Sequence, residues 1–385
     1  MRILLVGEYS RLHNSLKEGL QVLGHEVLLI STGDFFKKYP SDILLARKYD
    51  SGIPAKIKVG IYKLLGVDIT SRSIKNQFLK HQEQLKGFDV VQLINESPFA
   101  IQPQEEKAII HFLSNHNKKL FLLSCGADYV SVSHAMSDTH PYSVLSGYKD
   151  GMFAKERFVS LTKYLTAPFK DLHDFIYDRI SGVIASDMDY HLPLLDHPKY
   201  VGLIANPVNL SRLTIPEIKV TEPIVIFMGI NRGNYHTKGI QYFEEALEII
   251  KKKYGEHVKI DIVENLPYTE YIQRYNKAHI LLDQVLAYDQ GYNALEAMAK
   301  GKVVFTGAET EFEKHYALVA PVAINALPDT RYLVNELSTL IENPNLIIEI
   351  GERAKAFVAA IHDHVVVARS YVTVWNSSEK KTVEV

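Results

Sequence analysis

The chain has 385 residues, of which 46% are hydrophobic and 23% charged, so its apolar content suffices for two globular domains of about 150–200 residues each. A formal net charge of −2 argues against a nucleic-acid-binding protein, which usually carries a basic surplus. A single cysteine, Cys125, excludes an intramolecular disulfide. Neither a secretion signal nor a membrane-spanning stretch is recognisable, and we expect a cytoplasmic protein.

The first half opens with a strand–helix–strand pattern. Residues 3–6 form a short apolar run that ends at Gly7, leucines at helical spacing follow as far as Gly24, and residues 27–30 form the next apolar run. Runs that are apolar throughout are typical of strands buried on both faces of a parallel sheet. The same criterion predicts further strands at 90–94, 120–123, 182–185 and 200–204.

The pattern restarts after Pro223. Apolar runs and amphipathic stretches alternate there as they do in the first half. They predict strands at 224–228, 258–263, 279–282 and 303–305, and helices at 239–254, 268–277 and 294–299. Residues 206–222 contain prolines and show no strong periodicity, which indicates an interdomain connection.

These patterns predict an α/β protein with two Rossmann-like, doubly wound domains that face a cleft. The first domain would span 1–205, the linker 206–222 and the second domain 223–365. Ligands of open parallel sheets bind outside the carboxyl ends of the strands. We therefore expect the functional site in the cleft between the two domains.

Three motifs of the second half resemble the donor-binding domain of GT-B glycosyltransferases, in particular those of family 4. The first is the strand and loop at 227–232, followed by Lys238-Gly239. The second is Asp283-Gln284, and the third and most specific is the stretch GYNALEAMAKGKVV at 291–304. The first half resembles the acceptor domain of the same family more loosely, through Gly7 and the GHEV stretch at 24–27.

This resemblance implies a GT-B enzyme that moves a sugar, of the hexosyl type, from a nucleoside diphosphate sugar to a saccharide or lipid-linked acceptor. Such enzymes build polysaccharides or glycolipids, and the resemblance favours retention of the anomeric configuration. It implies no cofactor and no metal ion. Residues 357–375 resemble the last helix of the family, so 366–385 is expected to return to the first domain.

The proposed donor site combines cations, a helix start and a carboxylate. Arg232 and Lys238 follow the first strand of the second domain, where they are expected to bind the diphosphate as catalytic groups. Gly291 and Tyr292 begin a helix whose free N–H groups suit a phosphate. The resemblance makes Glu296 the acceptor of hydrogen bonds from the ribose hydroxyls. The alternatives are solvated loop charges, a plain turn and a surface glutamate.

Three further positions are candidates on weaker grounds. Gly7 follows the first strand and is expected to face the donor, as in the family's glycine loop. Asp128 follows the strand at 120–123 and is a candidate to hold an acceptor hydroxyl. By the resemblance, Leu266 lies where the family reads the base. An ordinary loop role is the alternative for each of them.

The chain departs from the family at Tyr288, where a second glutamate often stands eight residues before Glu296. Retaining members use that earlier carboxylate near the donor sugar. Tyr288 therefore leaves two alternatives open, which are a non-catalytic nucleotide-sugar-binding relative and a nucleotide-sugar epimerase on the same fold.

Residues 34–86 form a basic region with eleven Lys or Arg and five Asp or Glu, interleaved with apolar side chains that include Phe35 and Phe36. Such a region is a candidate for peripheral contact with the inner face of an anionic membrane. The alternative is a solvated helix face with a core side.

Overall fold

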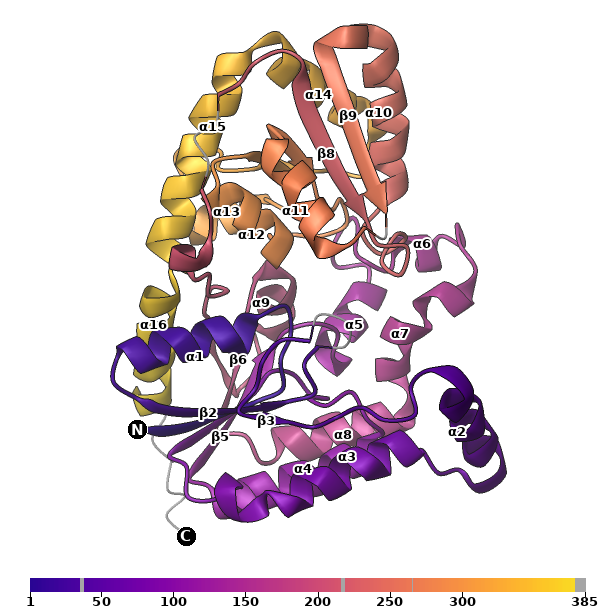
Figure 1. The fold of residues 1–385 in the computed structure, drawn as a ribbon, viewed down its shortest axis with the longest axis vertical. Helices are drawn as coiled ribbons and strands as arrows, with labels where there is room; N and C mark the ends of the chain where they lie inside the picture. Colours follow the sequence, from indigo (N-terminus) through magenta and orange to yellow (C-terminus); the bar gives the residue numbers. More distant parts are fainter. Residues whose placement is uncertain (35–37, 216–218, 265, 378–385) are drawn as a thin grey trace.

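The computed structural model describes residues 1–34, 38–215, 219–264 and 266–377. Its elements form two lobes stacked along the long axis of the molecule, each built on an all-parallel sheet with helices on both faces (Figure 1). The predicted fold class, two doubly wound Rossmann-like units, is confirmed.

The sheet of the first lobe has the strand order β3-β2-β1-β4-β5-β6-β7. Its strands are β1 (Arg2–Val6), β2 (Glu26–Ser31), β3 (Ile43–Leu44), β4 (Val90–Leu93), β5 (Lys119–Ser124), β6 (Gly182–Ala185) and β7 (Tyr200–Leu203). All of them except β3 coincide with a predicted apolar run. The edge strand β3 is only two residues long, too short to leave a recognisable pattern.

Helices connect the strands of the first lobe and cover its sheet. They are α1 (Leu12–Val22), α2 (Gly52–Leu65), α3 (Ile69–Lys80), α4 (Pro103–His116), α5 (Tyr129–Met136), α6 (Ser146–Lys149), α7 (Val159–Thr162), α8 (Ala167–Tyr177) and α9 (Met188–Leu194). Seven of these nine helices have at least one buried residue, whereas the four-residue α7 and the fourteen-residue α2 have none.

The sheet of the second lobe has the order β12-β11-β10-β8-β9. Its strands are β8 (Ile224–Ile230), β9 (Val258–Glu264), β10 (Ile280–Leu282), β11 (Val303–Thr306) and β12 (Ile324–Asn325). Its helices are α10 (Ile240–Tyr254), α11 (Tyr268–Lys277), α12 (Tyr292–Ala299), α13 (Thr310–His315), α14 (Thr330–Glu342) and α15 (Pro344–Phe357). Successive connections leave β8 toward β9 and then toward β10, so the switch point of the topology lies between β8 and β10.

The C-terminal helices cross from the second lobe back to the first, as expected (Figure 1). The stretch 357–375 is not one helix, because a π-helical turn at Val358–His362 separates α15 from α16 (His364–Ser377). The carboxylate of Asp363 accepts hydrogen bonds from the backbone N–H groups of Val365 (2.9 Å) and Val366 (3.2 Å) and so begins α16. The buried indole of Trp375 then donates to Gln92 Oε1 of β4 at 3.1 Å.

Among the helices of the described ranges, none has the length and hydrophobicity required to cross a bilayer.

The contact between α1 and α16 depends on Gly19. A Cβ at this position would lie 2.1 Å from the carbonyl oxygen of His364 and 3.0 Å from Ala368 Cβ. We expect Gly19→Ala to lower the free energy of unfolding by about 1–3 kcal/mol, because overpacking outweighs the roughly 1 kcal/mol that alanine contributes in a helix interior. Thermal and urea unfolding measure the change.

Gly60 of α2 is the matched control, because a Cβ there would meet no atom within 4 Å. Gly60→Ala is expected to leave stability unchanged or to raise it. Equal destabilisation by both substitutions would contradict the role assigned to Gly19.

Candidate functional site

Two loops that leave neighbouring strands meet at the switch point of the second sheet. β8 and β10 run parallel in register, so the loop 231–239 and the loop 283–291 emerge at the same edge. The ammonium of Lys238 contacts Asp283 Oδ1 at 2.9 Å, and Val285 N–H donates to the carbonyl of Lys238 at 2.8 Å. Gly239 has φ +67°, and a Cβ there would lie 3.0 Å from Val285 Cβ. The Lys-Gly pair thus requires its glycine for close packing and places its lysine at the sheet edge.

Asp283 connects the side chains that meet at this edge of the sheet. Its side chain is buried, and Oδ1 also accepts a hydrogen bond from Asn293 Nδ2 at 3.2 Å. Oδ2 is buried with no hydrogen-bond partner among the described residues. The nearest neighbour of a Cβ built on Gly291 is this same oxygen, at 3.9 Å. The structure therefore brings Lys238 and Gly291 together around one carboxylate.

The N-terminus of α12 is open to a ligand. Gly291 is its N-cap, and no side chain caps the helix. The first N–H groups of a helix carry a partial positive charge and lack intrahelical partners. Beyond Asp283 Oδ2, a Cβ on Gly291 would meet no other atom within 4 Å. An anion can approach the backbone closely here.

Glu296 lies on the same helix, one turn further along. It is half-buried, and no hydrogen bond or ion pair to it is found within the part of the chain that the structure describes. Burial raises the pKa of its carboxyl, and the positive charges of Lys300 and Arg11 oppose this rise. It faces a small cavity of about 30 Å³ together with Tyr292 of the same helix and Arg11 of the first lobe. A half-buried carboxylate without a partner is a costly arrangement that a hydroxyl-bearing ligand would relieve.

Arg11 of the first lobe lines the same cavity as Glu296, although no sequence pattern predicted it. Ser10 and Arg11 adopt left-handed backbone conformations with φ 49° and 72°, which cost energy for residues other than glycine. This geometry starts α1 and turns the guanidinium toward Glu18 and the Glu296 cavity. No local pattern marks Arg11, because its proximity to Glu296 arises only from the packing of the two lobes.

The other predicted cation, Arg232, is not joined to Lys238 by any contact that the structure records. Its guanidinium makes two hydrogen bonds with the carboxylate of Glu264 at the end of β9, and it lies 4.9 Å from the ring centre of Tyr235. Its role toward a phosphate stays a prediction. Leu266 packs half-buried against the core of the second lobe, and its role toward a base is likewise untested.

Gly7 and Asp128 have structural tasks in the first lobe. A Cβ on Gly7 would lie 2.3 Å from Ile94 Cγ2 and 2.8 Å from the carbonyl oxygen of Pro98, so packing alone requires glycine there. Asp128 is buried and caps α5, accepting hydrogen bonds from Ser131 N at 2.7 Å and from the hydroxyl of Ser124. Any role of Asp128 toward an acceptor remains a prediction.

Tyr288 makes a contact between the lobes. Its ring stacks on Tyr142 of the first lobe with centroids 5.1 Å apart, and its hydroxyl donates to the carbonyl of Tyr142 at 3.1 Å. Its backbone N–H donates to Asp189 at 3.1 Å, while Asp289 accepts from the N–H of Met188 at 3.0 Å. Burial raises the pKa of both aspartates. Tyr288, which stands at the position of the family's earlier glutamate, therefore helps to hold the two lobes together.

A larger groove of about 670 Å³ lies elsewhere, between α10 and the edge strand β9. Carboxylates dominate its charged lining, and only two cations accompany them. They are Glu244, Glu245, Glu248 and Asp261, with Lys251 and Arg274. This excess of negative charge is unsuited to an anionic donor.

Within the described ranges, no group of three or more His, Cys, Asp or Glu side chains is placed to hold a metal ion. His362 is buried with Nδ1 2.9 Å from the carbonyl oxygen of Asn206, and it serves the C-terminal turn.

The comparisons with known proteins agree with this architecture. Residues 234–373 match the family model described as glycosyl transferase-like. No curated protein matches the chain at the sequence level.

Solved structures resemble the chain over nearly its whole length. Sucrose-phosphate synthase from Thermosynechococcus elongatus is 14% identical with a TM-score of 0.61, and the alignment covers 98% of each chain. HepE from Anabaena, solved in complex with UDP and glucose, is 12% identical with a TM-score of 0.58 over 98% of this chain and 100% of its own. A glycosyltransferase from Rickettsia africae is 16% identical with a TM-score of 0.53 over 99% and 98%.

At such identities the likeness to solved structures shows the fold alone. The chain has the GT-B fold, and its residues 234–373 resemble the glycosyl transferase-like family.

Proposed function

We propose that the protein transfers a sugar from a nucleoside diphosphate sugar to a saccharide or lipid-linked acceptor. One arrangement carries this proposal. The uncapped start of α12, the ammonium of Lys238 and the unpartnered carboxylate of Glu296 lie along one edge of the second lobe. An anion-binding helix start next to a hydroxyl-binding carboxylate matches the diphosphate and ribose of such a donor.

The catalytic contribution would be electrostatic. Lys238 and the N–H groups at Gly291 are placed to stabilise the negative charge that develops on the departing diphosphate. Asp283 already neutralises Lys238 in this structure, so one ammonium cannot balance a diphosphate of about two negative charges. Arg11, which lines the Glu296 cavity from the first lobe and is paired with Glu18 as Lys238 is with Asp283, is the second cation that we assign to the donor.

The small size of the cavity constrains how the donor enters. About 30 Å³ accommodates a water molecule, whereas ligand pockets usually measure about 300–1,000 Å³. We infer that the lobes separate to admit the donor, which requires the contacts of Tyr288, Asp189 and Asp289 to open. HepE, whose structure contains UDP and glucose, shares this two-lobed fold and supports the proposed donor class.

The type of sugar, the stereochemical course and the biosynthetic pathway are inferred from the family resemblance alone. We propose hexosyl transfer with retention, in the synthesis of a polysaccharide or glycolipid. The second candidate is a relative that binds the nucleotide sugar without turnover. The specific observation in its favour is Tyr288, whose phenol occupies the place of the earlier glutamate and is committed to Tyr142.

A panel of labelled nucleotide sugars with purified protein separates these functions. The proposed transferase releases a nucleoside diphosphate and yields a labelled acceptor. A changed sugar that is still attached to its nucleotide would identify an epimerase instead. Tight binding with neither product would establish the non-catalytic relative.

Glu296→Ala is expected to weaken binding of the preferred nucleoside diphosphate by roughly tenfold or more, because a hydrogen bond to a charged group contributes about 1.5–3 kcal/mol. Isothermal titration calorimetry measures the effect, after a thermal-shift screen of UDP, GDP, ADP and CMP has selected the ligand. The matched control is Glu349→Ala, since Glu349 is exposed on α15 of the same lobe. Equal affinities for the wild type and Glu296→Ala would contradict the assignment.

Affinity for the nucleotide is also expected to depend on pH through Glu296. Burial raises its pKa above the ordinary 4.5, so acidification protonates the carboxyl earlier than that of a free glutamate. The ionised form accepts the stronger hydrogen bonds, and affinity therefore falls as the pH drops through the raised pKa. Calorimetry between pH 5 and 8 should show this component in the wild type and its loss in Glu296→Gln. Titration of the phosphate affects both proteins alike, so superimposable profiles would refute the role of Glu296.

A further inference from the structure

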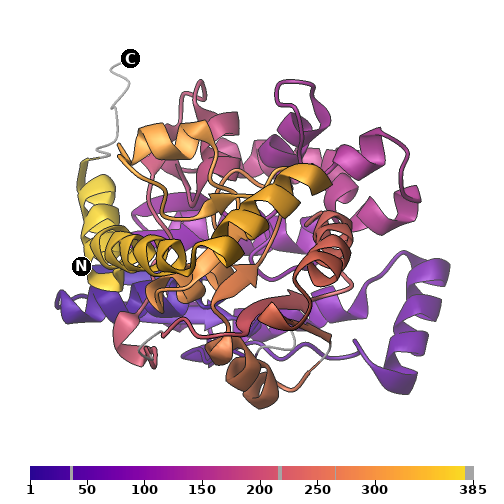
Figure 2. The same ribbon diagram turned by 90° about the horizontal axis from the view of Figure 1, so that it is seen from above.

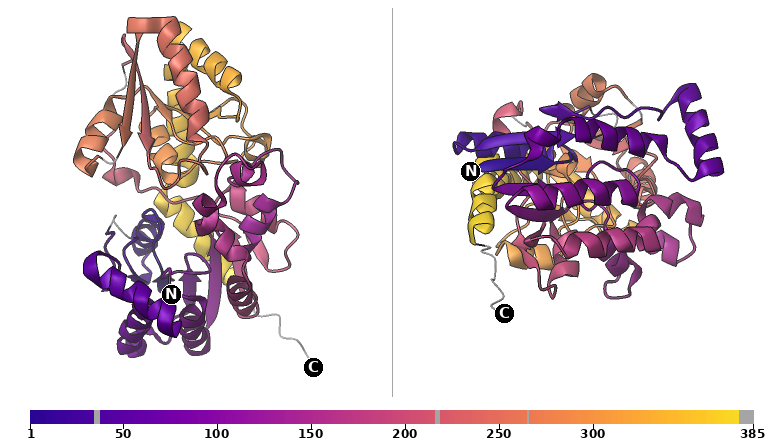
Figure 3. Two further views of the ribbon diagram at one scale, coloured as in Figure 1. Left: turned by 90° about the vertical axis from the view of Figure 1, so that its right-hand side faces the viewer. Right: turned by 90° about the horizontal axis from the view of Figure 1, so that it is seen from below.

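Helix α2 projects from the first lobe and buries none of its side chains. It spans Gly52–Leu65 and packs beside α3 at its base. Figure 1 shows it at the periphery of the molecule, and the views in Figure 2 and Figure 3 agree that it stands away from both sheets. A helix of fourteen residues that covers no core needs another reason for its apolar content.

Most of the exposed apolar side chains of α2 share one face, whereas Val59 and Tyr62 are exposed outside it. Ile53 and Ile57 are separated by one helical turn, and Leu64 and Leu65 continue the same face two turns later. Their exposed fractions are 74%, 55%, 83% and 72%. Single exposed apolar residues are ordinary on a protein surface, whereas a contiguous exposed face of this kind marks an interaction site.

All charged side chains of α2 are lysines. Lys58 points to the base of the helix, where its ammonium lies 2.8 Å from Asp50 and 3.8 Å from Asp68. Lys56 and Lys63 are exposed, and neither has an ion-pair partner within the described part of the chain. On a helical wheel both lie on the flank of the apolar face next to Ile53. The exposed side of α2 is therefore apolar with an uncompensated positive flank.

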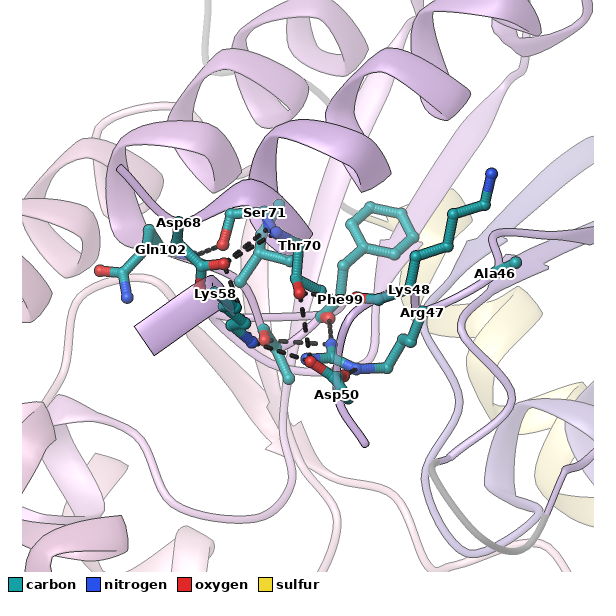
Figure 4. A network of polar contacts seen from close by, with 12 residues as sticks. Ala46, Arg47, Lys48, Asp50, Lys58, Asp68, Thr70, Ser71, Phe99 and Gln102 are labelled. Atoms are coloured by element: carbon teal, nitrogen blue, oxygen red, sulfur yellow. Dashed lines mark hydrogen bonds and ion pairs between the residues drawn. The ribbon is translucent and has the colours of Figure 1, made fainter. Parts of the chain in front are cut away.

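A polar network holds the base of α2 in place (Figure 4). Arg47 contacts Asp50 at 2.7 Å and donates to the carbonyl of Phe99 at 2.8 Å. Thr70 Oγ1 donates to the carbonyl of Lys48 at 2.7 Å, and Asp68 caps α3. These bonds tie the segments before and after α2 to the first lobe. The apolar face is thus presented in a defined direction.

We propose that α2 docks the protein on an anionic lipid bilayer, with its apolar face in the interface and Lys56 and Lys63 at the lipid phosphates. The positive charges of Lys56 and Lys63 are complementary to the negative charge of such a bilayer. Two copies of α2 packed face to face would bring four uncompensated lysines together, which disfavours self-association through this face. Interfacial helices combine an apolar face with lysines in this way, and their affinity depends on both. The contact is independent of the proposed sugar transfer.

Sedimentation of the full chain with vesicles tests the proposal. Binding to vesicles of phosphatidylcholine with 30% phosphatidylglycerol is expected, with weaker binding to phosphatidylcholine alone and at high salt. Each lysine near an anionic surface contributes about 1 kcal/mol, so Lys56→Gln with Lys63→Gln should weaken partitioning about thirtyfold. Leu64→Ser with Leu65→Ser should weaken it at least as much. No sedimentation of the wild type above a lipid-free control would overturn the proposal.

Matched control variants remove equivalent side chains elsewhere. Lys251→Gln with Lys252→Gln removes two exposed lysines of α10, and Val319→Ser with Ile348→Ser removes two exposed apolar side chains of the second lobe. These controls are expected to sediment like the wild type. Equal losses in the control and α2 variants would refute a specific role of α2. A lipid-free dimer in analytical ultracentrifugation that the α2 substitutions abolish would assign the face to a second copy instead.

A fluorescence measurement reports insertion directly. The chain has one tryptophan, Trp375, and it is only 1% exposed, so it provides a constant background. Leu64→Trp adds a reporter at the most exposed leucine of α2. Its emission is expected to shift to the blue with anionic vesicles and to be quenched by brominated lipid. A Leu64→Trp spectrum unchanged by vesicles would contradict insertion of this face.

Discussion

The ion pair between Lys238 and Asp283 joins the two loops that leave the second sheet at its switch point. It forms because β8 and β10 are parallel neighbours, so the residues that follow them emerge at one edge. Gly239 permits the close packing of the two loops, and the chain then turns through Gly291 into α12. The position of Glu296 follows from this turn, since it is fixed on the helix that Gly291 begins.

The contact between the two lobes constrains which residue can stand at position 288. Burial raises the pKa of the Tyr288 phenol, and the nearby carboxylates of Glu309 and Asp189 raise it further. A glutamate at this position would be repelled by both carboxylates, whereas a tyrosine provides a neutral ring to stack on Tyr142. The departure from the family pattern therefore has a physical reason in the contact between the lobes.

The charged residues of the chain divide into those with partners and those without. Arg232, Lys58 and Arg47 are satisfied by neighbouring carboxylates and serve the structure. Glu296 and the exposed lysines of α2 have no recorded partner in the described residues, which makes them available to a ligand or a surface. The two available groups lie in different lobes, so contact with a surface and binding of a nucleotide need not compete.

Sequence alone determined the local elements and the motif-bearing loops of this protein. Apolar runs bounded by glycines predicted the longer strands of both sheets, because strands buried on both faces leave a continuous signal. The same reasoning placed Lys238 after the first strand of the second domain and Gly291 at the start of a helix, and the resemblance singled out Glu296 on that helix. Reasoning from apolar runs failed at β3 and β12, which are two residues long and leave no periodicity to detect.

Tertiary structure alone decided which distant residues share the site and what each side chain is free to do. Gly7 is a glycine of the kind expected in a ligand-binding loop. A Cβ at this position would clash with Ile94 and Pro98, so the packing of the first lobe by itself requires glycine. Asp128 lies in a loop after a strand, where one of its carboxylate oxygens caps α5 and the other accepts a hydrogen bond from Ser124 at the end of β5. Arg11 and Glu296 are far apart in sequence and meet in one cavity. Such contacts depend on strand order and on the packing of the lobes, which no local pattern of residues encodes.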